Sequence, residues 1–86
     1  MNTTERIGWD NSCNKGIKFT VESSYNGQWH RLFIAEVFIG YVEKYDRSYW
    51  RFAPVIGGPT GRFNHGQECL DWVINQITIN NRLGDR

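Results

Sequence analysis

The segment from residue 29 to residue 53 constrains the fold most, because its apolar residues occupy both alternating registers. Successive side chains of a strand point to opposite faces, so a sheet with one face in water shows one polar register. The registers read Trp29, Arg31, Phe33, Ala35, Val37, Ile39 and Tyr41 on one side, and His30, Leu32, Ile34, Glu36, Phe38, Gly40 and Val42 on the other. One helix in an 86-residue chain can cover one face, so we expect a partner protein or a second copy on the other.

The first strand and its hairpin are the clearest local prediction. Ile17, Phe19 and Val21 alternate with polar residues, which is typical of a strand with one buried face. Asn26-Gly27 then separates two such runs. This dipeptide is the strongest short hairpin signal and predicts a type I′ turn, with positive φ at both central residues.

The run from Gln28 to about Lys44 is long for a strand. We interpret it as one bent strand with a bulge marked by Gly40, and two strands meeting near Glu36 are the alternative. Residues 45–48 predict a turn, and residues 49–53 predict the return strand.

A loop and a C-terminal helix complete the chain. The glycines and proline of residues 57–61 predict a loop, and Asn64 or His65 stands at the helix start. At 100° per residue, one helix face carries an apolar stripe of Leu70, Val73, Ile74 and Ile77. The remaining apolar residues, Trp72, Ile79 and Leu83, fall on the opposite side, unless the helix frays after Thr78.

The expected fold class is therefore α+β, with an antiparallel sheet of three strands and one C-terminal helix packed on one face. A fourth strand is added if the long run divides. The polar residues 1–15 predict a loosely ordered N-terminal arm, and residues 16–86 a single α+β domain.

Composition excludes several function classes. A net charge of +1 argues against a surface built throughout for polyanions. Two cysteines, Cys13 and Cys69, and no apolar leader or membrane-length run favour a cytoplasmic protein with reduced thiols and no membrane association. Neither cysteine lies in a nucleophile motif. His65 and Cys69 have a helix-compatible spacing, but Cys13 and His30 lack the close spacing that the other half of a zinc site needs. We expect no enzymatic activity, no metal and no cofactor.

A basic and aromatic segment is the best candidate for a binding site. Residues 44–62 carry four cations against Asp46 alone, interleaved with aromatic side chains. Arginine beside aromatic rings is typical of nucleic-acid surfaces and of protein-interface hot spots; a solvated hairpin tip is the structural alternative. The candidate binding residues are Lys44, Tyr45, Arg47, Tyr49, Arg51 and Arg62, with Trp72 on the helix.

Four short motifs give the chain a loose resemblance to known modules: Gly40-Tyr41-Val42, Trp50-Arg51-Phe52, Gly61-Arg62-Phe63 and Cys69-Leu70-Asp71-Trp72-Val73. Their outline resembles the sheet-plus-helix modules of AP2-type and integrase amino-terminal DNA-binding domains. That resemblance implies sheet residues that enter the major groove. The outline is equally similar to small sheet-and-helix proteins of phages and mobile elements, some of which block host defence by binding protein.

These observations give two functional expectations. The first is a small non-catalytic protein-interaction module, of the kind carried by phages or mobile elements, that forms a homodimer or other homo-oligomer through an apolar sheet face. The alternative is a nucleic-acid-binding module that uses the hairpin 44–52 and Arg62.

Overall fold

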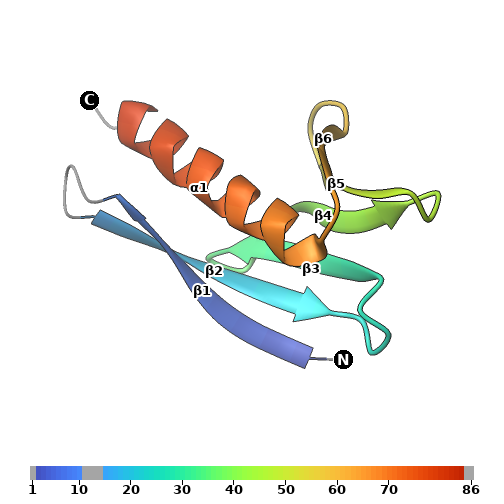
Figure 1. Ribbon diagram of the computed structural model, residues 1–86. Helices are drawn as coiled ribbons and strands as arrows, with labels where there is room; N and C mark the ends of the chain where they lie inside the picture. Colours follow the sequence, from blue (N-terminus) through green and yellow to red (C-terminus); the bar gives the residue numbers. More distant parts are fainter. Residues whose placement is uncertain (1, 11–14, 85–86) are drawn as a thin grey trace.

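A computed structural model describes residues 2–10 and 15–84 of the chain. They form one antiparallel sheet of six strands in the order β1-β2-β3-β4-β5-β6, and one helix, α1, lies across one face of this curved sheet (Figure 1). The elements are β1 (Asn2–Asp10), β2 (Lys15–Ser23), β3 (Trp29–Ile34), β4 (Val37–Tyr45), β5 (Tyr49–Pro54), β6 (Thr60–Phe63) and α1 (Gly66–Gly84).

The α+β class with a C-terminal helix agrees with the sequence, but the prediction of three or four strands was wrong because the sheet has six. Residues 2–10 form β1 and pair along their whole length with β2, where a loosely ordered arm was expected. Residues 11–14 of that arm lie outside the described residues. At the other edge, residues 60–63 form β6, so the predicted loop 57–61 overlaps a strand.

The long run divides into β3 and β4, so the preferred bent strand was wrong and the alternative was right. Ala35 and Glu36 make the turn with φ of 48° and 67°, the geometry of a type I′ hairpin without glycine. The bulge expected near Gly40 is present: Gly40 pairs with Leu32 and Phe38 pairs with Phe33, so Ile39 has no opposite residue.

The hairpin at Asn26-Gly27 is confirmed, but its turn type differs from the prediction. Gly27 alone of these two takes a positive φ, 70°, and its N–H donates to the Ser24 carbonyl at 3.1 Å. The Ser24 hydroxyl accepts from the backbone N–H of Gln28 at 3.0 Å and that of Trp29 at 3.3 Å. A serine side chain therefore stabilises this loop by binding its free amides.

The core lies between α1 and one face of the sheet. The stripe predicted on the helix is confirmed, since Leu70, Val73 and Ile74 are buried and Ile77 packs against them. Their sheet partners are Phe19, Val21, Leu32, Val42, Trp50 and Phe52. The helix continues to Gly84 without a break after Thr78. We call the other face of the sheet, which α1 does not cover, the open face.

Candidate functional site

The open face gathers aromatic rings and arginines on β3 to β6. Its register contains Trp29, Arg31 and Phe33 on β3, Phe38, Tyr41, Glu43 and Tyr45 on β4, Tyr49 and Arg51 on β5, and Arg62 on β6. The buried core residues of the same strands alternate with this set, because side chains of a strand point to opposite faces. The apolar character of the second register therefore reflects a ring-rich surface outside the core.

Four of the rings form a connected row across β3 and β4. The ring centroids of Trp29 and Tyr41 are 6.4 Å apart and perpendicular, those of Tyr41 and Phe38 are 5.0 Å apart, and those of Phe38 and Phe33 are 5.6 Å apart. Edge-to-face contacts of this kind stabilise by about 0.5–1.5 kcal/mol each beyond the burial of area. The ring contacts hold these side chains in fixed orientations, so the row is a preorganised surface for binding.

Three guanidinium groups lie on rings of the open face. Their carbon atoms are 5.0 Å from the ring centroid for Arg31 over Trp29, 3.8 Å for Arg51 over Tyr45 and 4.1 Å for Arg62 over Tyr49. Arginine is well suited to this role because its planar group stacks on aromatic faces and is weakly hydrated. The open face thus covers part of its own apolar area, and Tyr41 and Tyr45 keep 39% and 44% of their surface exposed.

The cations of this face mostly have carboxylate partners on neighbouring strands. Arg31 pairs with Glu22 at 3.1 Å, and Arg51 donates to Glu43 from two nitrogens, at 3.1 and 3.2 Å. Lys18 on β2 pairs with Glu5 on β1 at 2.7 Å. Among the described residues, Arg62 is the cation of this face without a carboxylate partner.

The structure brings four of the predicted binding residues together. Tyr45 and Tyr49 lie side by side with centroids 5.7 Å apart, and Arg51 and Arg62 stack on them. We call these four residues the tyrosine–arginine cluster.

The other three predicted residues lie elsewhere. Lys44 pairs with Trp50 and so belongs to the opposite register, and Arg47 lies in the β4–β5 turn with φ of 58°. Trp72 on α1 is half-buried against Phe63 of β6, with centroids 5.6 Å apart. Its ring therefore takes part in the packing of α1 on the sheet.

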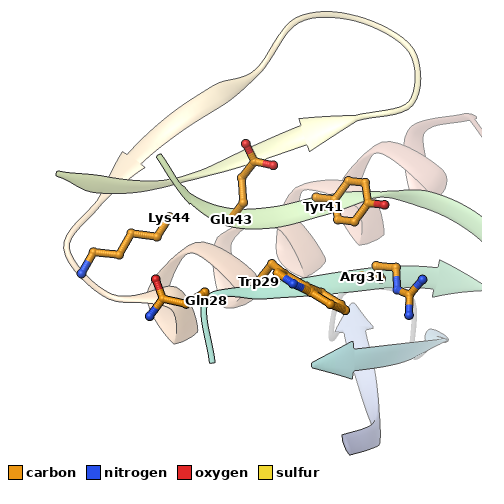
Figure 2. A pocket seen from close by; sticks show the side chains of 6 residues that line it. All are labelled: Gln28, Trp29, Arg31, Tyr41, Glu43 and Lys44. Atoms are coloured by element: carbon orange, nitrogen blue, oxygen red, sulfur yellow. The ribbon is translucent and has the colours of Figure 1, made fainter. Parts of the chain in front are cut away.

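A shallow hollow lies on the open face beside the tyrosine–arginine cluster, and it was not predicted from the sequence. Trp29 and Arg31 of β3 and Tyr41 and Glu43 of β4 form its floor and sides, and Gln28 and Lys44 line one end (Figure 2). Trp29 lies opposite Glu43, and Arg31 lies opposite Tyr41 in the strand pairing. Dividing the long run at Glu36 places these four side chains together only if the bulge at Ile39 then shifts the pairing of β3 with β4 by one residue.

A histidine and a serine interact on the helix side of the sheet. The Ser23 hydroxyl and His30 Nδ1 are 2.6 Å apart, and the His30 ring stacks on Trp50 at 5.6 Å. Burial lowers the pKa of His30, so the ring is kept neutral. A nucleophile–base pair also needs an orienting acid, and within the described chain no carboxylate contacts His30. This arrangement supports the β2–β3 hairpin.

The thiol of Cys69 is fully buried in the core, and burial raises its pKa to about 11, which keeps it protonated and unreactive. Cys13 lies outside the described residues. Across residues 2–10 and 15–84, no three His, Cys, Asp or Glu side chains are grouped for metal binding. The described helix is too polar to qualify as a membrane span.

Comparison with known proteins gives no assignment: no family model matches the chain, and no curated protein or solved structure matches it significantly.

Proposed function

We propose that this chain is a non-catalytic protein-interaction module whose contact surface is the open face. The observation that carries the proposal is the combination of exposed, oriented rings with charges that are already paired inside the chain. Tyr, Trp and Arg are the residues enriched at the centres of protein interfaces, where charged groups need partners when water leaves. On the open face Glu22 and Glu43 supply those partners for Arg31 and Arg51.

A second copy of the chain is the first partner we propose, and the cytoplasm is the compartment. The open face offers two apolar areas for such a contact. One is the row of rings on β3 and β4, with Tyr41 and Tyr45 exposed; the other is on β1, where Ile7 and Trp9 are 66% and 51% exposed. The polar side chains of β2, including Lys18 and Glu22, lie between the two.

Sedimentation velocity over a wide range of protein concentration tests this proposal. Two matched double variants each remove two exposed apolar side chains, Tyr41→Ser with Tyr45→Ser on β4, and Ile7→Ser with Trp9→Ser on β1. We expect association that the β4 pair abolishes and the β1 pair leaves largely intact. Association that depends on the β1 pair alone would move the contact away from the rings. A strict monomer would exclude the second copy as partner.

A second candidate function, binding of single-stranded nucleic acid, is favoured by the tyrosine–arginine cluster. Single-strand binders combine stacking rings with cations that follow the phosphates. Arg62 stacks on Tyr49 at 4.1 Å and has no carboxylate partner among the described residues. Retention of a single-stranded oligonucleotide that falls steeply with salt, and is lost with Arg62→Gln, would favour this function over the first. Absence of retention at low salt would exclude it.

A further inference from the structure

We propose that the hollow lined by Trp29 and Tyr41 binds a proline-rich segment of a partner protein in the polyproline II conformation. This inference rests on the proposed interaction function and adds a second partner for the open face, because this chain has two prolines and does not itself carry a proline-rich segment.

The hollow combines two aromatic rings with side-chain hydrogen-bond donors. Trp29 and Tyr41 present two perpendicular rings, 6.4 Å apart, with an indole N–H and a hydroxyl. The side-chain amide of Gln28 adds a further donor at one end. Glu43 supplies the carboxylate of the hollow, and two nitrogens of Arg51 already bind it.

A ligand for such a surface should be apolar and rich in acceptors. Proline has no backbone N–H, and a polyproline II helix makes no internal hydrogen bonds, so its carbonyls all face outward as acceptors. Its rings pack against aromatic side chains, and the segment loses little conformational entropy because it is already extended. The rings and hydrogen-bond donors of the hollow are therefore complementary to the rings and carbonyl acceptors of a proline-rich segment.

The same residues disfavour the other ligands that aromatic surfaces take. A cationic ligand would meet Arg31, whose guanidinium already lies 5.0 Å from the Trp29 ring centroid. An added β-strand needs a free edge, but β3 and β4 are interior strands paired on both sides. A phosphate backbone would face Glu43 on the wall, and Arg31 is already paired with Glu22 at 3.1 Å.

Titration of the ¹⁵N-labelled protein with a decaproline peptide tests this inference, with a Gly/Ser peptide of equal length and an oligothymidylate as competing probes. We expect decaproline to shift the Trp29 indole and Tyr41 amide signals, and the other two probes to leave them unchanged. Trp29→Phe and Tyr41→Phe each keep a ring and remove one donor, so each should weaken decaproline binding by about three- to tenfold. Tyr49→Phe in the neighbouring tyrosine–arginine cluster is the matched control and should leave the affinity unchanged.

Three outcomes would overturn the inference: no shift with decaproline, stronger shifts with oligothymidylate, or an equal loss with Tyr49→Phe. The failure of the inference is distinguishable from failure of the proposed function. If decaproline does not bind but self-association is lost with Tyr41→Ser and Tyr45→Ser, the open face is an interface and its occupant is a second copy. If oligothymidylate alone binds there, both proposals fail. Because Trp29→Phe could also loosen the row of rings, unfolding of both variants in urea is measured alongside.

Discussion

The two faces of the sheet keep aromatic surface from water in different ways. On the helix side Phe19 and Leu32 are fully buried under α1. On the open face the rings are covered in part by arginines of the same chain, and Tyr41 and Tyr45 remain 39% and 44% exposed. Burial under a helix is permanent in the folded state, whereas a stacked guanidinium can be displaced. The helix side therefore serves stability, and the open face keeps its rings accessible to a partner.

The strongest test of this difference makes the same phenylalanine-to-alanine substitution on each face of the sheet. Phe19→Ala empties a fully buried site and should cost about 3–5 kcal/mol of unfolding free energy. Phe33→Ala, on the open face, should cost about 1–2 kcal/mol, because the half-buried ring is already partly in water and loses mainly its contact with Phe38. Urea unfolding followed by circular dichroism measures both.

Phe19→Ala could leave the small domain largely unfolded, so the leucine variants keep the comparison measurable. Phe19→Leu should still cost more than Phe33→Leu. Equal costs at the two positions would mean that the open face is as tightly packed as the core, and the distinction between the faces would be lost.

Two glycines on adjacent strands provide a second comparison. A Cβ added at Gly8 would collide with the Thr78 hydroxyl and come within 2.9 Å of Ile74, both on α1. At Gly16 it would meet the Trp9 ring at 2.8 Å, on the open side where that ring can move away. We expect Gly8→Ala to cost about 1–3 kcal/mol, as overpacking of a core does, and Gly16→Ala to be close to neutral.

Thermal or urea unfolding of the two alanine variants measures this difference. A neutral Gly8→Ala would show that α1 can move away from β1 at no cost, and the close contact between the helix and this edge strand would then not be a constraint on the fold.

How far the sequence predicts the fold depends on where local signals agree with tertiary packing. The strand at residues 17–21 and the helical stripe were predictable because alternation and 3.6-residue periodicity match one buried face each. The division of the long run near Glu36 was predicted only as the alternative, because Ala35 and Glu36 both take positive φ, a conformation usually reserved for glycine or asparagine. Here the pairing of β3 with β4 imposes the turn against local preference.

The candidate site was predictable in part, for the same reason. Residues 45–51 cluster because they flank one hairpin turn, so their proximity follows from local sequence. The hollow at Trp29 and Tyr41 needs the correct register between β3 and β4, including the bulge at Ile39. A one-residue change of register moves every side chain to the other face, so this part of the site could not be placed without the structure. β1 was not predicted because residues 2–6 are all polar, so neither alternating register of this strand shows the apolar pattern of a buried face.

Acidification should lower the stability of the domain through His30, a buried residue on the helix side of the sheet. Burial lowers its folded-state pKa below the usual 6.5, so in the range below pH 6.5 the unfolded chain binds a proton that the folded chain does not. Stability therefore falls as the pH drops through this range, by at most about 1.4 kcal/mol per pH unit for one proton. Urea unfolding between pH 7.5 and pH 5, about the range where histidine titrates, measures the slope.

His30→Gln should flatten that slope, whatever it does to the absolute stability. A slope that persists in His30→Gln would assign the pH dependence to another group.

The smallest expected effect tests whether guanidinium stacking covers the open face. Arg51 lies 3.8 Å above the Tyr45 ring and binds Glu43 with two nitrogens, and a lysine can reproduce neither the planar stack nor the two-nitrogen contact. Arg51→Lys should therefore lower stability by about 0.5–1 kcal/mol, less in high salt, and expose Tyr45 to nitration. Arg6→Lys is the matched control, because Arg6 pairs with Asp71 of α1 on the helix side. Two results together would contradict this: an equal loss of stability in both variants, and nitration of Tyr45 in Arg51→Lys no faster than in the original protein. Arg51 would then contribute its charge alone, and the rings of the open face would not be covered by arginines of their own chain.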